Sequence, residues 1–222
     1  MKLLQLLAPA SLFLTTLTFA GEPPANSALI LEDAFQRDEL GKGWKATTGK
    51  WSIENGVLVG RELVEEKHSA AIRRVLLTDN AVYELKFRFV KSGKSFHFGF
   101  DPAHGELKKK GHLFSVIVTR AGWKIMKHLD KNNRKEDPNE TLAEQKMSLA
   151  IGKWHELRVT TWGTSVTASI DDSEKLKAFH PTFGVKKPAL VFRCLGDGVE
   201  LDSVRVWRPI DKQAEAVEEK RE

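Results

Sequence analysis

The sequence predicts an all-β protein, a sandwich or barrel of about a dozen short strands. Apolar and polar residues alternate in many short segments, which is the two-residue period of a half-buried strand. Turn residues such as Asn55-Gly56 and Gly196-Asp197-Gly198 separate these segments. No segment inside the domain has a convincing amphipathic helical pattern. Strands are therefore expected to form the core.

The turn residues divide the chain into strands in a definite order. The first clear hairpin joins residues 51–53 to 57–59 across Asn-Gly, the strongest short hairpin signal. Further strands are expected at residues 81–90, 96–101, 111–120, 123–128, 154–162, 166–170, 188–195 and 199–207. Residues 139–149 are the one helix-compatible stretch and could cover a sheet edge. No composition break or internal repeat indicates a second domain, so the chain of 222 residues is expected to form one.

The N-terminus has the pattern of a secretory signal peptide. Lys2 precedes an apolar run that ends at Phe19, and Ala20 is a small residue at the expected cleavage site. An uncleaved N-terminal anchor is the alternative. We expect a secreted or periplasmic protein without a membrane span after signal removal. The expected boundaries are a signal peptide at 1–20, a linker at 21–27, the β domain at 28–210 and a charged tail at 211–222.

Charge and cysteine content limit the partners and the chemistry. The net charge of +5 is mild and permits acidic partners. The densest basic cluster, Lys108 to Lys110, has no interleaved aromatic residues, so nucleic acid is not an expected partner. Cys194 is the only cysteine, which excludes an intrachain disulfide. It alternates with Leu190 and Phe192 and is expected to be a small buried hydrophobe.

Four stretches together resemble a known type of secreted bacterial domain. They are LEDAFQRDELGKGWKATTGKWSIENGVLVG (31–60), AVYELKFRFV (81–90), IGKWHELRVTTWGTSVTASIDD (151–172) and GVELDSVRVWR (198–208). Their order and spacing resemble the concanavalin A-like (laminin G-like) jelly roll, and most of all the family named 3-keto-disaccharide hydrolase, distant relatives of family-16 glycoside hydrolases. The resemblance implies a β-sandwich of two antiparallel sheets whose last strand pairs with the first. It also implies a carbohydrate or glycan partner, although jelly rolls host many functions.

The acidic pattern of family-16 glycosidases is not reproduced. Those enzymes place carboxylates at alternate positions of one strand, but Lys86 and Arg88 follow Glu84 on the same face. We expect a ladder of surface ion pairs there instead. Glu200 and Asp202 also share a strand face, roughly 7 Å apart, and are compatible with an inverting pair only in principle. Their place on the closing strand favours a structural role.

The chain also departs from the 3-keto-disaccharide hydrolase pattern. That family has a Ser-Gly pair and an arginine on one strand, followed by a Gly-Tyr-Glu strand. Here Gly99 stands without the arginine, and Gly111-His112-Leu113 replaces Gly-Tyr-Glu.

The stretch SFHFGFDPAHGE (95–106) opens a cluster of histidines. Four of the seven, His97, His104, His112 and His128, lie within about thirty residues on expected neighbouring strands. His97 and Asp101 share a face that His112 could join across a hairpin. Such a set could act as general base or hold a divalent metal, although no spacing matches a zinc or calcium signature. The alternative is a core strand with a polar back, followed by a turn.

The six tryptophans provide a second group of candidates, because indole rings stack on sugar rings. Trp44, Trp51, Trp154 and Trp207 coincide with the strand framework and are expected in the core. Trp123 and Trp162 adjoin turn glycines and are the expected ligand contacts. Candidate polar partners for them are Arg120 and Arg193.

Three functions remain open at this stage. The first is a carbohydrate-binding domain without catalysis, which predicts exposed tryptophans and no convergent acid–base set. The second is a glycoside hydrolase or lyase acting on (3-keto-)disaccharides or glycans, which predicts His97, Asp101 and His112 in one pocket. The third is a structural or adhesion sandwich with neither feature. The failed glycosidase pattern favours binding over catalysis.

Overall fold

The computed structural model describes residues 24–171 and 173–210. The predicted signal peptide (1–20) and charged tail (211–222) lie outside the described residues, as does the start of the predicted linker, residues 21–23. The described chain contains fifteen strands and two short 3-10 helices, η1 (Val64–Glu66) and η2 (Pro181–Gly184). Neither helix in these ranges has the length and apolar character needed to cross a membrane.

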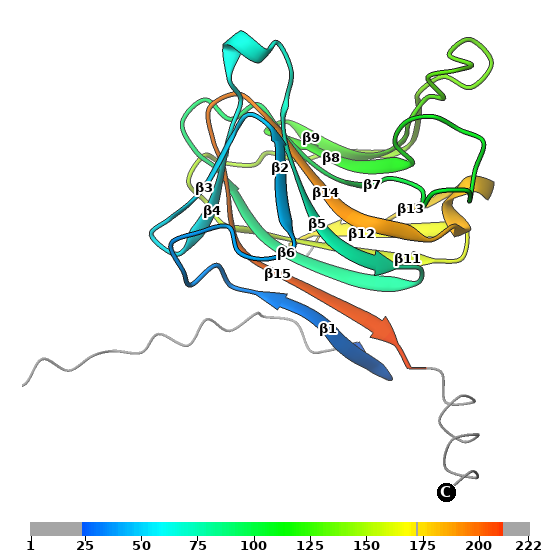
Figure 1. The fold of residues 1–222 in the computed structure, drawn as a ribbon, viewed down its shortest axis with the longest axis horizontal. Coiled ribbons are helices and arrows are strands. Elements are labelled where there is room, and N and C mark those ends of the chain that lie inside the picture. The colour runs from blue at the N-terminus through cyan, green and yellow to red at the C-terminus, as the bar shows by residue number, and fades with distance from the viewer. Residues whose placement is uncertain (1–23, 172, 211–222) are drawn as a thin grey trace, which may run out of the picture.

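The strands form two antiparallel sheets stacked on each other, as Figure 1 shows. The eight-stranded sheet has the order β13-β12-β11-β6-β15-β4-β3, and β1 pairs with another part of β15. Its strands are β1 (Ser27–Asp33), β3 (Lys50–Glu54), β4 (Val57–Arg61), β6 (Ala81–Phe89), β11 (His155–Trp162), β12 (Ser165–Ile170), β13 (Leu176–Phe179) and β15 (Val199–Pro209).

The seven-stranded sheet has the order β10-β9-β8-β7-β14-β5-β2. Its strands are β2 (Trp44–Thr48), β5 (Ala70–Thr78), β7 (Ser95–Phe100), β8 (Phe114–Thr119), β9 (Gly122–Lys127), β10 (Glu140–Lys146) and β14 (Lys187–Leu195). In Figure 1 the loop that carries η1 rises at one end of this sheet, and the loops after β7 and β9 rise at the other. The outer face of the seven-stranded sheet is therefore bordered by loops.

The core between the sheets is rich in aromatic rings. Phe96, Phe98 and Phe100 are 0–1% exposed and point inward from β7. The Phe96 ring stacks 5.1 Å from Phe87, and the Phe100 ring lies 5.0 Å from Tyr83, so β7 packs on β6 of the other sheet. Burying each such side chain contributes about 1.5–3 kcal/mol. Because strand residues alternate in direction, the residues between the phenylalanines must face outward.

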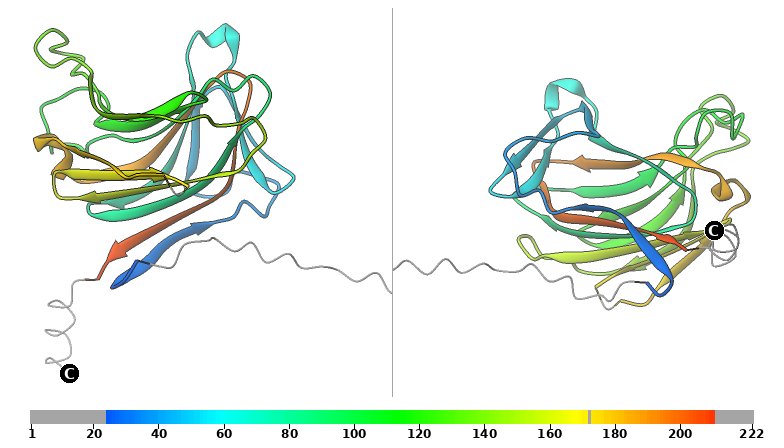
Figure 2. Two further views of the ribbon diagram at one scale, coloured as in Figure 1. Left: turned by 180° about the vertical axis from the view of Figure 1, so that it is seen from behind. Right: turned by 60° about the horizontal axis from the view of Figure 1, so that its bottom comes forward.

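The predicted all-β fold of two antiparallel sheets is confirmed, including the closing pair. Leu31 of β1 pairs with Val206 of β15, and Figure 2 shows β1 (blue) beside β15 (orange-red) in both views. The predicted hairpin at Asn55-Gly56 is present as β3 and β4. Cys194 is fully buried, as predicted. Three predicted core tryptophans are buried at 7–9% exposure, namely Trp44, Trp51 and Trp207.

Two predictions differ from the structure. Residues 140–146 form β10 rather than a helix, because pairing with β9 from Glu140↔Lys127 to Lys146↔Gly122 satisfies their backbone groups. Trp154 is only half-buried, and its ring carries the Arg88 guanidinium 4.3 Å from its centroid on the outer face of the eight-stranded sheet.

The same outer face holds the predicted ladder of ion pairs. Its three contacts are Arg158–Glu84 at 3.1 Å, Lys86–Asp202 at 3.4 Å and Arg88–Glu200 at 2.5 Å. Each carboxylate that resembled part of a glycosidase pattern is thus paired with a cation. The ladder accounts for the acidic residues of β6 and β15 without catalysis.

Candidate functional site

The outer face of the seven-stranded sheet carries a polar cluster over its central strands. His97 on β7 pairs in register with Arg193 on β14 and with Ile117 on β8, and Ile117 pairs with Lys124 on β9. These four residues form one row across the sheet, which we call the arginine row. The sequence placed His97 and Arg193 among the candidate site residues, and the fold brings them to adjacent positions.

The next row on the same face consists of Val191, Gly99 and Ser115, and we call it the floor of the site because its side chains are short. Gly99 on β7 pairs with Val191 on β14 and with Ser115 on β8. A Cβ atom added at Gly99 would lie 2.2 Å from Ser115 Oγ, so only glycine leaves room for this hydroxyl. Ser115 Oγ in turn lies 2.8 Å from His128 Nε2, in a hydrogen bond. Gly99 therefore permits the contact that orients His128.

Beyond the floor, Asp101 joins two basic side chains. His112 Nδ1 donates to Asp101 Oδ1, and Arg73 Nη2 donates to Asp101 Oδ2 at 3.0 Å. Burial alone would raise the pKa of Asp101, but the hydrogen bonds and charges of His112 and Arg73 outweigh it and hold the pKa below its usual value. Asp101 is therefore ionised at neutral pH. The His112 ring stands 5.5 Å from the His128 ring.

Two lysine side chains hold together the loops that carry His112 and His128. Lys109 donates to the backbone carbonyl of His128 and lies 3.3 Å from Asp137 Oδ2. Lys127 also bonds to the Asp137 carboxylate and donates to Pro138 O at 2.9 Å. These contacts hold the end of β9 against the loop after β7, so His112 and His128 keep a fixed separation.

Two imidazoles of the cluster are held neutral. Burial, with the charges of Arg193 and Lys124, lowers the pKa of His97 to about 4. Burial, with the charges of His112 and Arg193 among others, lowers the pKa of His128 to about 3. A neutral imidazole offers one donor and one acceptor, which suits hydrogen bonding to hydroxyl groups.

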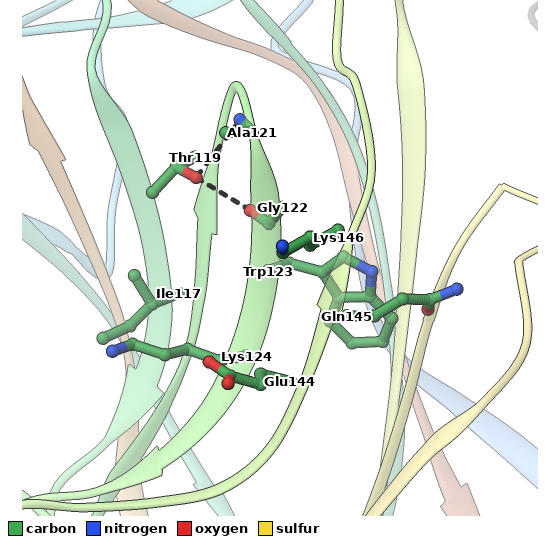
Figure 3. A pocket seen from close by; sticks show the side chains of 9 residues that line it. All are labelled: Ile117, Thr119, Ala121, Gly122, Trp123, Lys124, Glu144, Gln145 and Lys146. Carbon is green, nitrogen blue, oxygen red and sulfur yellow. Dashed lines mark hydrogen bonds between the residues drawn. The ribbon is translucent and has the colours of Figure 1, made fainter.

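Hollows lie at both ends of the cluster. One, of about 580 Å³, is lined by Arg73, Asp101 and His112 together with the loop at residues 102–111. The other, of about 460 Å³, lies over the β8–β9 turn and is shown in Figure 3. Ile117 and Lys124 line it, and in that view Thr119 Oγ1 bridges the turn. The arginine row therefore runs into the second hollow.

The predicted catalytic set is only partly assembled. Asp101 and His112 are in direct contact, as the hairpin argument predicted. His97 shares their face but bonds to Ser95 Oγ at 3.1 Å, and it makes no hydrogen bond to Asp101 or His112. His104 is exposed in the loop that follows β7. Among the described residues, no group of three or more His, Cys, Asp and Glu side chains could hold a metal ion.

The predicted ligand contacts are dispersed. Trp123 was expected to be exposed, which is wrong: it is 3% exposed because it lies in one row with the core residues Phe96 and Val118 and faces the interior between the sheets. Trp162 is 62% exposed, as expected, but it lies on the eight-stranded sheet, beside a hollow of about 500 Å³. Arg120 is exposed in the β8–β9 turn. Of the four predicted contacts, only Arg193 lies within the polar cluster.

Three polar members of the cluster were missed from the sequence, namely Arg73, Ser115 and Lys124. Arg73 reaches Asp101 from β5, which is 28 residues earlier in the chain. Ser115 was overlooked because a serine between apolar residues is unremarkable in a strand. The register of β7 and β8 could have indicated Ser115, because it places this serine opposite Gly99, where no side chain covers it on that strand.

Comparisons with known proteins establish the fold. No family model matches the sequence, and no curated protein is a significant match. The laminarinase from Rhodothermus marinus matches with a TM-score of 0.65 and 13% identity over 83% of this chain and 98% of that chain. The carbohydrate binding module CBM66 from Bacillus subtilis matches with a TM-score of 0.57 and 14% identity over 72% and 91% of the respective chains.

A third similar structure is the GlcNAcα1-4Gal releasing endo-β-galactosidase from Clostridium perfringens. Its TM-score is 0.63, with 14% identity over 87% of this chain and 65% of that chain. At these identities the likeness concerns the fold alone. The fold is the concanavalin A-like jelly roll that the sequence resemblance implied.

Proposed function

We propose that this protein is a carbohydrate-binding jelly-roll domain whose ligand lies on the outer face of the seven-stranded sheet. One observation carries the proposal: a half-buried polar cluster occupies the centre of that face. It combines neutral imidazoles, a serine hydroxyl, guanidinium groups and a carboxylate. The similar folds in a carbohydrate binding module and in glycanases support the same class of ligand.

The chemistry of the cluster suits sugar hydroxyls. Each hydroxyl is both a donor and an acceptor, and the cluster supplies both kinds of group on a surface with small residues at its floor. Sites for small ligands commonly combine a few fixed polar groups with a surface shaped by apolar residues. Ile117 and Val191 provide buried apolar surface beside His97 and Gly99.

Binding without two-carboxylate hydrolysis is favoured by the position of the acidic residues in this sheet, because its strands carry Asp or Glu only on the edge strand β10 (Glu140 and Glu144). The strands β2, β5, β7, β8, β9 and β14 contain no Asp or Glu. Asp101, just after β7, is bonded to both His112 and Arg73. A glycosidase of the usual type needs two carboxyl groups flanking the scissile bond.

A second candidate function is a glycoside hydrolase or lyase, favoured by the Asp101–His112 pair. Asp101 accepts from His112 Nδ1 and thereby fixes the tautomer in which Nε2 has a free lone pair. Among the described residues no hydrogen bond engages His112 Nε2, so it is available as a general base. Release of reducing ends or unsaturated products from a glycan, abolished in Asp101→Asn, would support this candidate.

Isothermal titration against a panel of oligosaccharides tests the binding proposal. His97→Ala and His128→Ala should each weaken binding by at least fivefold, because each removes a hydrogen-bonding group worth about 1 kcal/mol or more. Trp162→Ala serves as the matched control, because it removes an exposed aromatic residue from the other sheet. Loss of binding in the tryptophan variant alone would move the site to the eight-stranded sheet. Absence of binding to every glycan would favour the structural or adhesion alternative.

We further propose that the protein acts outside the cytoplasm, secreted or periplasmic. The support is the sequence of residues 1–20, a charged start followed by an apolar run and a small residue. N-terminal sequencing of the protein recovered from cells tests this. A mature chain that begins at Gly21 is expected, and an intact Met1 in the soluble cytoplasmic fraction would contradict it.

A further inference from the structure

We propose that the ligand of this face is an acidic glycan, and that Arg193 binds a carboxylate of its uronic acid units. This inference rests on the proposed carbohydrate-binding function and narrows its ligand class. Arg193 lies in the centre of the sheet, and the described residues offer it no hydrogen-bond or ion-pair partner.

Arg193 differs from every other half-buried arginine of the described chain. The other seven each donate to a carboxylate or a carbonyl, and they are Arg37, Arg61, Arg73, Arg74, Arg88, Arg158 and Arg205. Among the described residues, Arg193 makes no hydrogen bond and no ion pair. Burial lowers its pKa, but a guanidinium remains charged in proteins. A half-buried cation without an acceptor is costly unless a ligand supplies one.

The groups around Arg193 do not neutralise it. On one side it pairs with Ala71, which is small and uncharged, and on the other with His97, which is neutral at neutral pH. The charge of Asp101 acts on Arg193, but that carboxylate is already bonded to Arg73 and His112. The centre of the outer face therefore keeps one uncompensated positive charge.

The other cation of the arginine row, Lys124, lies opposite an acidic residue. Lys124 lies three strands from Arg193, about 14 Å away at the usual strand spacing. Glu144 on β10 pairs in register with Lys124, so Lys124 has an acidic neighbour that Arg193 lacks. The uncompensated charge is thus concentrated at Arg193 and not spread along the row.

Arg193 is half-buried, so part of its side chain is open to a ligand. The adjacent floor of Val191, Gly99 and Ser115 is low, with no side chain at the glycine. The planar fork of arginine binds a carboxylate through two parallel hydrogen bonds, a geometry that lysine cannot reproduce. A uronic acid unit would place its carboxylate on Arg193 while a hydroxyl reaches the half-buried His97.

The experiment compares two oligosaccharides of equal length by isothermal titration. An oligogalacturonate carries one carboxylate on each unit, and a β-1,3-glucan oligosaccharide carries none. The variants are Arg193→Gln, which removes the charge, and Arg193→Lys, which keeps the charge without the fork. Arg208→Gln, which removes an exposed charge from the eight-stranded sheet, is the matched control. Dextran sulfate, added as a third ligand, reports a preference for sulfate or for charge alone.

The wild-type protein should bind the uronate oligosaccharide more tightly than the neutral one. Arg193→Gln should weaken uronate binding about 10- to 100-fold, the usual effect of a charge-assisted hydrogen bond, and Arg193→Lys should recover only part of it. Arg208→Gln should leave binding within twofold. The Tm of Arg193→Gln should equal or exceed that of the wild type, since an unpaired charge has been removed. A purely structural role for Arg193 predicts a lower Tm instead.

The failures of the two proposals are distinguishable. A protein that binds the neutral oligosaccharide as well as the uronate, with no effect of Arg193→Gln, overturns the acidic-ligand inference while the binding function stands. Equal binding of dextran sulfate in the wild type and in Arg193→Gln also overturns it, because the attraction is then non-specific. A protein that binds none of the three ligands removes the support for both proposals.

Discussion

Replacing Gly99 with alanine tests how the floor of the site is built. The backbone of Gly99 has no positive φ, so alanine adds no backbone strain and its effect is steric. The new Cβ would lie 2.2 Å from Ser115 Oγ, 2.7 Å from Phe114 O and 3.0 Å from Ser115 Cβ. Since ordinary contact starts near 3.4 Å, the β8 backbone must retreat by about 0.7 Å from the carbonyl contact alone.

This overpacking should lower the free energy of unfolding by about 1–3 kcal/mol. For a chain of this size, each kcal/mol corresponds to a fall in Tm of about 2–4 °C. Urea unfolding followed by tryptophan fluorescence measures the change, and titration with glycan reports whether Ser115 and His128 still bind. Glycan affinity should fall together with stability, because the alanine displaces the hydroxyl that orients His128.

The double variant provides the internal control. Ser115→Ala alone removes the hydrogen bond to His128 and should cost about 0.5–1.5 kcal/mol. It also removes the closest clash, so Gly99→Ala with Ser115→Ala should cost at least 0.5 kcal/mol less than the sum of the single changes. Strict additivity, or a Gly99→Ala protein within about 0.5 kcal/mol of the wild type, would refute the reasoning.

Three further predictions concern protonation, reactivity and a turn. In the folded protein the pKa values of His97 and His128 are lowered to about 4 and about 3, so the unfolded chain binds more protons below about pH 6.5. Stability should therefore be complete near pH 7 and decline as the pH falls toward 4. A variant with glutamine at both positions should show a flatter dependence of Tm on pH, and an unchanged slope would contradict this. Burial raises the pKa of Cys194 to about 12, so the thiol should not react with a thiol reagent in the native protein and should react fully in denaturant. Rapid reaction of the native protein would be inconsistent with the burial of Cys194. Asp171→Ala should lower the free energy of unfolding by about 1–3 kcal/mol, because the Asp171 carboxylate accepts a hydrogen bond from buried His155 Nδ1 at 2.8 Å. Asp171→Asn should lose less stability in the same denaturation assay. Equal losses of stability in the two variants would argue against this role.

The alternation in SFHFGF was sufficient to separate core from surface. The direction of each side chain depends only on its position in an extended strand, so Phe96, Phe98 and Phe100 had to share one face. The contact of Asp101 with His112 was also within reach, because one hairpin joins them. These features depend on neighbours in the chain, which the sequence displays directly.

The errors came from partners distant in sequence. The glycine beside Trp123 indicated an exposed turn, but the indole lies in the row of Phe96 and Val118 and faces the core between the sheets. The segment that forms β10 had been interpreted as a possible helix, because its edge position leaves few apolar residues to mark a strand.

The sequence by itself determined the fold class, the strand order along the chain and the polar character of the strand that carries His97. Only the tertiary structure decided that β14 lies between β7 and β5, which places Arg193 beside His97, and Arg73 in contact with Asp101. Local periodicity encodes side-chain direction, whereas the choice of neighbouring strand depends on packing between segments about a hundred residues apart or more. For that reason the site could be recognised as polar from the sequence, while the lack of a partner for Arg193 among the described residues became evident only in the folded sheet.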